Sequence, residues 1–136
     1  MYASDASASA IAKAKAGLYR ERSFRNLPLH LQSKYFWEKA NNQWQIIPEI
    51  HHRIEWSIAN LVIENEIQYL ASANIIFCRN VFIYFDHDAI RKTINIFHKN
   101  MLKPGYLCIA ASESLLRLTN KFELQEINGA FIYVKS

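Results

Sequence analysis

Glycine and cysteine are both scarce in this chain. Only three glycines occur in 136 residues, Gly17, Gly105 and Gly129, and no two of them are close enough to form a GxGxxG or GxxxxGK loop. The sequence therefore contains no glycine-rich segment of the kind that cradles a nucleotide. The two cysteines, Cys78 and Cys108, each lie in an apolar run without CxxC spacing, which excludes a disulfide framework and a zinc-binding pair. We expect two free, buried thiols in a reducing compartment.

Long apolar runs and blocks of like charge are also lacking. No segment approaches the roughly 20 apolar residues of a membrane span, and the N-terminus does not follow the pattern of a signal peptide. We therefore expect a cytoplasmic protein without membrane insertion. The net charge is +4, but the basic residues are scattered, so no basic stripe indicates nucleic-acid binding. His51 and His52 point to opposite faces of an extended chain and have no third ligand nearby, so we expect no metal site.

What the chain does have is apolar residues in regular patterns. Hydrophobic residues make up 51% of the sequence and aromatic residues 13%, which is enough for the core of one domain. The clearest pattern is a helix with a capping Asp86 or Asp88, a lysine-rich end and a stop at Pro104–Gly105. Its apolar face is formed by residues at helical spacing: Ile90, Ile94, Phe97 and Met101.

The remaining elements indicate an α/β fold. A short strand before Asp5 leads to a helix capped by Ser7 or Ser9 and ended by Gly17, after which residues 17–27 read as a loop. Pro28 begins a second helix, and the apolar residues within 41–53 show no clear helical or strand periodicity. Strands are expected over residues 54–58, 74–78 and 106–110, with a hairpin at Asn128–Gly129. We predict a mostly parallel sheet with helices against it, in which residues 74–78 are fully buried, and an antiparallel C-terminal addition.

Segments with polar residues follow four of the predicted strands. They are Asp5, Asn60–Leu61, Arg79–Asn80–Val81 and Ser112–Glu113–Ser114. Ligands of open α/β sheets bind beyond the carboxyl ends of the strands, so we expect these residues to converge on one edge. A carboxylate accepts hydrogen bonds from ribose hydroxyls, and an Asn amide matches an adenine edge. The pattern favours a nucleoside-containing cofactor.

The segment Asn74–Asp86 reads NIIFCRNVFIYFD and resembles the FCRNVLIYFD motif of the CheR family of protein-glutamate methyltransferases. Further similarities agree in order and spacing and extend over residues 2–134: Ala3–Asp5, Ala12–Tyr19, Arg25–Pro28, Leu31–Phe36, Asn60–Leu61, Leu102–Gly105 and Ser112–Ser114. The resemblance implies a Rossmann-like methyltransferase sheet that binds S-adenosylmethionine and ends in an antiparallel hairpin. It also implies methylation of glutamates on the cytoplasmic helices of chemotaxis receptors.

The same resemblance implies roles for individual residues. Asp5 would hold the ribose, Asn60 and Leu61 would flank the cofactor, and Asn80 and Val81 would line its adenine and methionine sides. The transferred methyl group would face Tyr84. Apart from the resemblance, arginines in the loop after the first helix, among them Arg22 and Arg25, suit an acidic receptor helix.

Plainer interpretations stand beside these roles. Asp5 is also suited to the N-terminus of a helix, and Tyr84 to a position in the core. The arginines are also typical of a solvated surface, and Glu113 of a residue that closes a hydrogen-bonded turn between Ser112 and Ser114.

The chain also departs from the family pattern. In the family, a first strand and a glycine-rich loop come before the position of Asp5 in the sequence. In the sheet, that first strand lies between the strand ending at Asp5 and the strand ending at Cys78. Residues 1–136 are therefore expected to form a partial domain with two unpaired inner strand edges. The family's GHSE signature reads Ala110–Ala111–Ser112–Glu113 here. The alternative to an enzyme is a truncated, non-catalytic remnant or a fragment that binds a receptor or another partner.

Overall fold

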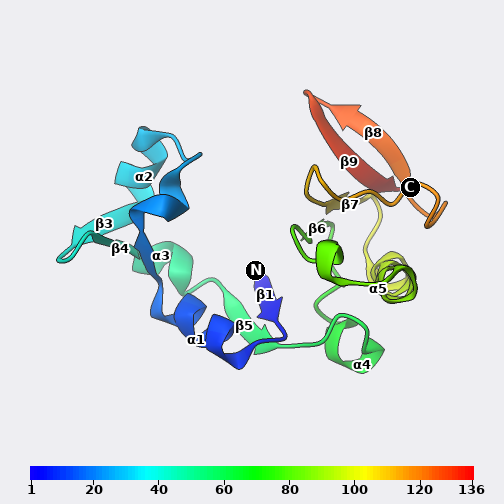
Figure 1. Ribbon diagram of the computed structural model, residues 1–136, viewed down its shortest axis with the longest axis horizontal. Coiled ribbons are helices and arrows are strands. Elements are labelled where there is room, and N and C mark those ends of the chain that lie inside the picture. Colours follow the sequence, from blue (N-terminus) through cyan, green and yellow to red (C-terminus); the bar gives the residue numbers. More distant parts are fainter. The chain divides into compact units, whose positions relative to one another are not determined.

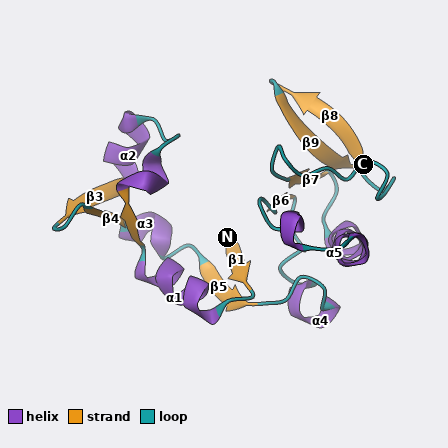
Figure 2. Ribbon diagram, viewed as in Figure 1, coloured by secondary structure: helices purple, strands orange, loops and turns teal.

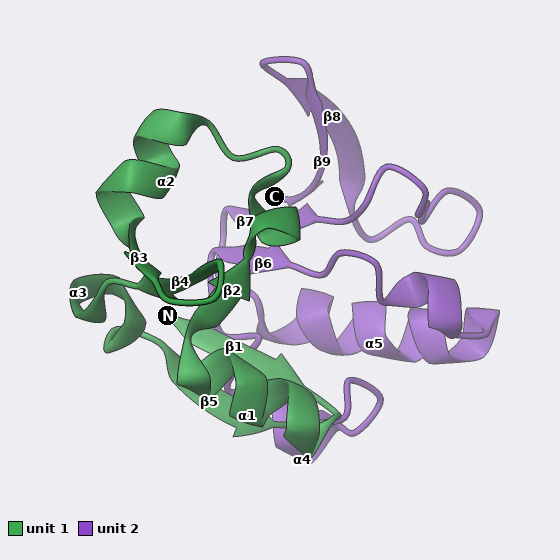
Figure 3. Ribbon diagram, turned by 60° about the vertical axis from the view of Figure 1, so that its left-hand side comes forward, with its two compact units in different colours: residues 1–59 green, residues 60–136 purple.

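The computed structural model describes residues 1–136 as two compact units, Met1–Ala59 and Asn60–Ser136 (Figure 3). The elements of the first unit are β1 (Tyr2–Asp5), α1 (Ala8–Ala16), β2 (Leu18–Arg20), the 3-10 turn η1 (Glu21–Phe24), α2 (Leu29–Tyr35), β3 (Phe36–Lys39), β4 (Gln43–Ile46), α3 (Pro48–His51) and β5 (Glu55–Ile58) (Figure 1). Those of the second unit are α4 (Glu64–Ile67), β6 (Ile75–Phe77), the 3-10 turn η2 (Phe82–Tyr84), α5 (His87–Asn100), β7 (Gly105–Cys108), β8 (Glu123–Ile127) and β9 (Ala130–Lys135). Helices and strands occur in both units (Figure 2), which confirms a mixed α/β chain.

In the first unit, β1 and β5 form a parallel pair in register from Tyr2 opposite Glu55 onward. Helix α1 follows β1 with the ends predicted from the sequence. The Ser7 side chain accepts a hydrogen bond from the backbone N–H of Ala10, and Gly17 ends the helix at φ 63°, a left-handed conformation that glycine adopts without strain.

The second sheet of this unit was not predicted. Strands β2, β4 and β3 form an antiparallel sheet in that order, so residues 17–27 are not all loop and residues 41–53 are not without structure. The turn between β3 and β4 contains Asn41 at φ 61° and Asn42 at φ 53°, a conformation that Asn tolerates better than most residues. An aromatic cluster stabilises the sheet, because the Phe24 ring centroid lies 4.8 Å from that of Phe36 and 5.3 Å from that of Trp44.

The sheet of the second unit has the order β6-β7-β9-β8. β6 and β7 are parallel, whereas β9 runs antiparallel to both β7 and β8. Asn128 at φ 51° and Gly129 at φ 80° form the turn between β8 and β9, which confirms the predicted hairpin. The strands predicted to be parallel are parallel in their pairs, β1 with β5 and β6 with β7. The antiparallel sheet formed by residues 18–46 was not predicted.

Helix α5 provides the core of the second unit. The Asp86 side chain accepts a 2.8 Å hydrogen bond from the backbone N–H of Ala89 and caps the helix. The four residues predicted as its apolar face are all buried: Ile90, Ile94, Phe97 and Met101. Each such side chain stabilises the fold by about 1.5–3 kcal/mol relative to an exposed position. No helix of the chain combines the length and the apolar character needed to cross a membrane.

Strand β6 is parallel as predicted, but it is not buried. The exposed fractions of Ile75 and Phe77 are 55% and 74%. β7 is the only strand paired with β6, which is therefore the edge strand of its sheet. An apolar run identifies such a strand, but its side chains are buried only where other elements cover the faces of the sheet, and Ile75 and Phe77 are left uncovered.

Candidate functional site

The loop after β6 contains two of the predicted cofactor residues and is held by one carboxylate. The Oε2 atom of Glu113 accepts hydrogen bonds from the backbone N–H of Asn80 at 3.1 Å and of Ala110 at 2.8 Å. Its Oε1 atom accepts from the N–H groups of Val81 and Phe82, each at 2.8 Å. Glu113 is 9% exposed, so a single buried carboxylate joins the segments that follow β6 and β7.

These contacts determine the ionisation of Glu113. Burial works to raise the pKa of its carboxyl group, but the hydrogen bonds from Ala110, Asn80, Val81 and Phe82 outweigh burial, and the pKa lies below its usual value. The carboxylate is therefore charged at neutral pH. Its partners are backbone amides rather than a cationic side chain.

The residues held by Glu113 present different groups to solvent. Asn80 has φ 58° and is exposed, whereas Val81 is half-buried. Phe82 is buried and begins η2, which ends at Tyr84. Tyr84 is 81% exposed, so it is not the core aromatic of the plainer interpretation. The structure brings Asn80, Val81 and Tyr84 into one short anchored segment.

Asn60 and Leu61 lie at the start of the second unit in a tight turn. The Asn60 side chain accepts a 3.2 Å hydrogen bond from the N–H of Val62, and its own N–H donates to Glu66 Oε2 at 2.7 Å. The carbonyl oxygen of Leu61 accepts a 3.3 Å hydrogen bond from the hydroxyl of Thr93, a buried residue of α5. Backbone contacts therefore fix the conformation of both residues.

Asp5 belongs to the first unit and ends β1. Its Oδ1 atom accepts a 2.7 Å hydrogen bond from the N–H of Ser7, so it orders the turn into α1, as the plainer interpretation expects. The side chain is exposed and a carboxylate has four acceptor positions, so capacity for a ligand remains.

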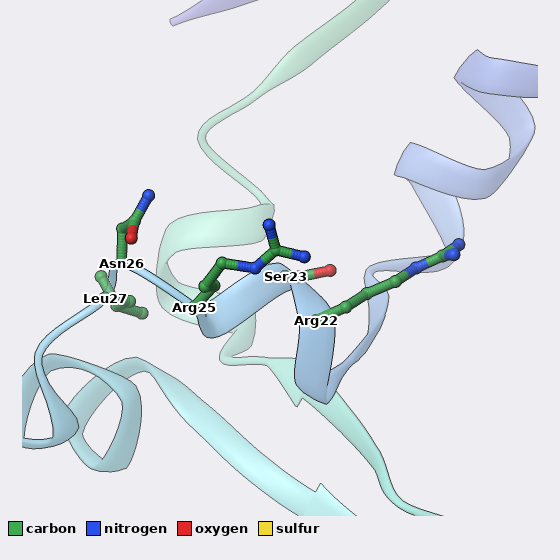
Figure 4. A pocket seen from close by; sticks show the side chains of 5 residues that line it. All are labelled: Arg22, Ser23, Arg25, Asn26 and Leu27. Carbon is green, nitrogen blue, oxygen red and sulfur yellow. The ribbon is translucent and has the colours of Figure 1, made fainter.

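Arg22 and Arg25 border an open hollow of about 480 Å³ in the first unit, together with Ser23, Asn26 and Leu27. Figure 4 shows both guanidinium groups extending from the η1 region, with Arg22 reaching away from Asn26 and Leu27. All the hydrogen-bonding side chains of this hollow are exposed. Phe24, between Ser23 and Arg25 in the chain, is buried and packs against Phe36, so the exposed arginines flank a fixed residue.

The four hydrogen bonds that Glu113 accepts, which we call the Glu113 clamp, were not predicted from the sequence, in which this residue suggested only a local turn. A local turn is present, but it joins Glu113 to Ala110 and not Ser112 to Ser114: the N–H of Glu113 donates to the Ala110 carbonyl oxygen at 2.9 Å. The signal available in the sequence was an acidic residue a few positions after the end of β7. Its partners Asn80 to Phe82 lie about thirty positions away, and spacing alone does not pair such residues.

Cys78 is excluded as a nucleophile at this site. Burial, reinforced by the negative charge of Glu113, raises the pKa of the Cys78 thiol to about 12. Its N–H donates to the Cys108 carbonyl oxygen at 2.9 Å and continues the pairing of β6 with β7. Cys78 is thus part of the scaffold beneath the anchored segment.

Comparison with known proteins identifies relatives of this chain. The family described as CheR methyltransferase, SAM binding domain, matches residues 1–131. Chemotaxis protein methyltransferase 2 of Vibrio cholerae is 32% identical over 133 residues, which cover 98% of this chain and 46% of the relative. The chemotaxis protein methyltransferase of Vibrio anguillarum is 34% identical, and chemotaxis protein methyltransferase 1 of Pseudomonas aeruginosa 32%, each over 96% of this chain and 47% of the relative.

This chain spans about half the length of the curated relatives that it matches. The family match nevertheless covers nearly the whole chain and includes every candidate residue of the site. The motif NIIFCRNVFIYFD, which carries the resemblance in the sequence, contains β6 and the segment held by Glu113. This chain belongs to the CheR methyltransferase family, and its residues 1–131 match that family's S-adenosylmethionine-binding domain.

Proposed function

We propose that this chain is the cofactor-binding part of a methyltransferase that uses S-adenosylmethionine to methylate glutamate side chains of chemotaxis receptors. The family match over residues 1–131 is the observation that carries the proposal. Relatives that are named chemotaxis protein methyltransferases support it. Because this chain spans about half of their length, the activity, substrate and partners of the whole protein remain part of the proposal.

The fold contributes through its parallel strand pairs. We assign both units to a Rossmann-like methyltransferase fold: β1 and β5 are the parallel pair of the first unit, and β6 and β7 are that of the second, which continues into the hairpin β9–β8. The order β6-β7-β9-β8 supports this assignment, since a parallel pair is extended by an antiparallel hairpin as expected. Residues 1–136 then constitute part of one methyltransferase domain.

The candidate residues fit the chemistry of an adenosine-containing cofactor. The exposed carboxylate of Asp5 has free acceptor positions for ribose hydroxyls, and the exposed amide of Asn80 can both donate to and accept from an adenine edge. Val81 offers a half-buried apolar surface beside it. Asn60 and Leu61, fixed by contacts with α4 and α5, flank the cofactor in this proposal.

The proposed reaction requires little acid–base catalysis by the protein. S-adenosylmethionine, when bound, supplies a methyl group already activated by a sulfonium. An ionised receptor glutamate is already a nucleophile, so no residue of the chain has to remove a proton. The chain contributes alignment and exclusion of water, for which proximity effects reach roughly 7–11 kcal/mol in favourable cases. We assign Tyr84, exposed at the end of η2, to the side of the transferred methyl group.

The receptor is assigned to the cationic hollow of the first unit. Arg22 and Arg25 present two permanent positive charges there, and an acidic helix bearing the glutamate substrates is attracted to such a surface. This role places the protein in the cytoplasm, where receptor signalling helices are found. It assigns no nucleic-acid partner and no membrane insertion.

A non-catalytic role is the second candidate. The exposed apolar side chains of Ile75 and Phe77 on edge strand β6 favour it, because a parallel strand at the centre of a working sheet is normally covered on both faces. In that case the chain retains part of the fold and a surface for a receptor or another partner.

Calorimetric titration of the folded protein with S-adenosylhomocysteine separates the two candidates. We expect saturable binding that weakens by about tenfold or more in Asp5→Ala and in Asn80→Ala, since each removes a hydrogen bond to the ligand. Asp88→Ala is the matched control, because Asp88 is exposed on α5 and pairs only with Arg91. The control variant should bind like the unmodified protein.

Absence of binding at about millimolar ligand, the concentration at which the binding free energy is only some 4 kcal/mol, would overturn the claim that this chain holds the cofactor by itself. The non-catalytic role would then stand. Binding that Asp5→Ala and Asn80→Ala leave unchanged would retain the cofactor and refute the assigned residues.

A further inference from the structure

The parallel pairing of β6 and β7 is continued beyond its last backbone hydrogen bond by a side chain. The ladder ends where the N–H of Cys78 donates to the Cys108 carbonyl oxygen at 2.9 Å. Beyond that point the backbones are joined through Glu113, whose Oε2 atom accepts from Asn80 on one side and from Ala110 on the other. The carboxylate takes the place of the next ladder bonds at the carboxyl ends of two neighbouring strands.

A carboxylate is required for this geometry. Four N–H donors point at the Glu113 side chain, and each carboxylate oxygen accepts two of them. A glutamine of the same size would offer one acceptor oxygen and would turn an NH₂ group toward two of the donors. An aspartate would keep both oxygens but place them closer to its own backbone. The three residue types therefore differ predictably in how they hold the loop.

Glu113 is itself supported from the core. The N–H of Leu115, two residues later, donates a 2.9 Å hydrogen bond to the hydroxyl of Tyr133 on β9. Leu115 and Tyr133 are 1% and 5% exposed. The segment that carries the carboxylate is therefore fixed to the sheet before it reaches across to Asn80, so the clamp transmits the position of the sheet to the loop.

We infer that Glu113 is a positioning residue of the cofactor site. It touches no ligand. Its hydrogen bonds set the backbone of Asn80, Val81 and Phe82, and through the turn that Phe82 begins they set the place of Tyr84. The link to the cofactor rests on the proposed function, whereas the clamp itself is independent of any ligand.

Amide hydrogen exchange tests the clamp directly. In Glu113→Gln we expect the amides of Asn80, Val81 and Phe82 to exchange about tenfold faster or more. A hydrogen bond to a charged acceptor changes the equilibrium between the closed and the open state by about tenfold or more. The amides of Ile94 and Phe97 in α5 should keep their protection. Glu126→Gln is the matched control, since it makes the same chemical change on the exposed face of β8 and should alter none of these rates.

Two results would overturn the inference at this level. One is unchanged exchange at residues 80–82, and the other is an equal loss of protection throughout residues 60–136, which indicates a general structural role. If Glu113→Gln does not fold, a pH titration of the unmodified protein replaces it. The amide shifts of Asn80, Val81 and Phe82 must then follow one common carboxyl titration, and three unrelated titrations refute the clamp.

Binding of S-adenosylhomocysteine tests the link to the cofactor. Glu113→Gln should raise the dissociation constant by about tenfold or more, and Glu113→Asp should restore part of the loss because it keeps both acceptor oxygens. Unchanged binding in Glu113→Gln would refute the positioning role. If the unmodified protein does not bind the ligand, the proposed function fails in this chain, and the exchange rates alone decide whether Glu113 holds the segment.

Discussion

The ammonium group of Lys135 donates a 2.6 Å hydrogen bond to the carbonyl oxygen of Met101, so the last strand caps the helix that forms the core of its unit. A second hydrogen bond, of 2.5 Å, runs to the carbonyl oxygen of His98. Lys135 is 6% exposed. Its charge also faces the negative end of the α5 dipole, so one buried cation satisfies carbonyl oxygens that the helix leaves without partners.

We therefore expect Lys135→Met to lower the free energy of unfolding by about 2 kcal/mol, because it leaves buried carbonyl oxygens without donors. Urea denaturation measures the change. Lys92→Met is the matched control on the exposed face of α5, and its effect should stay within about 0.5 kcal/mol. A loss of equal size in both variants would show that the cap contributes nothing.

Alanine substitutions at Gly17 and Gly129 distinguish the cost of a strained backbone from the cost of steric crowding by the added Cβ atom. Both glycines have positive φ, 63° and 80°, so an alanine at either position is strained by about 1 kcal/mol. A Cβ atom at Gly17 would also lie 2.8 Å from Gln45 Nε2 and 2.9 Å from Ile46 Cγ2, whereas one at Gly129 meets nothing within 4 Å. We expect Gly17→Ala to cost about 1–3 kcal/mol more than Gly129→Ala in thermal unfolding. Equal costs would mean that β4 moves aside freely.

Glu113 should make stability depend on acidity. Its folded pKa lies below the ordinary value of 4.5, so the unfolded chain binds the proton more readily as the pH falls. The stabilisation is complete above the unfolded pKa and is lost as the pH falls through the folded pKa. We expect the difference in unfolding free energy between the unmodified protein and Glu113→Gln to be constant near neutral pH and to shrink below pH 4.5. A difference that grows under acid would contradict the charged clamp.

The two thiols should react at different rates. Burial and the charge of Glu113 raise the pKa of Cys78 to about 12. Burial also raises the pKa of Cys108, although the positive charge of Arg79 partly lowers it. The Cys108 side chain is only half-buried. At about pH 8 iodoacetamide should modify Cys108 well before Cys78, because the thiolate is the reactive form. Mass spectrometry of digested samples measures both rates, and in denaturant the two should become equal.

Local patterns in the sequence predicted several elements correctly. The spacing of Ile90, Ile94, Phe97 and Met101 identified the buried face of α5, since only one helical phase gathers these side chains. The pair Asn128–Gly129 identified the hairpin because both positions require positive φ. In each case the determining interaction lies within a few residues of the chain.

Strands whose stability comes from distant residues were missed. β2 and β4 are short and lack a clear period, and they are held by their pairing and by rings such as Tyr19 and Phe24, whose centroids lie 6.5 Å apart. The exposure of Phe77 was also not predicted, because an apolar residue specifies a preference for burial and not the presence of a covering neighbour.

By itself the sequence determined the family, the ends of α1, the phase of α5, the C-terminal turn and the residues that follow the strands, because these depend on local spacing or on a motif read along the chain. Only the tertiary structure decided that Glu113 holds Asn80, Val81 and Phe82, and that Lys135 caps α5. Both contacts join residues more than thirty positions apart. The fold brings such groups within hydrogen-bonding distance, and no pattern in the sequence encodes that distance.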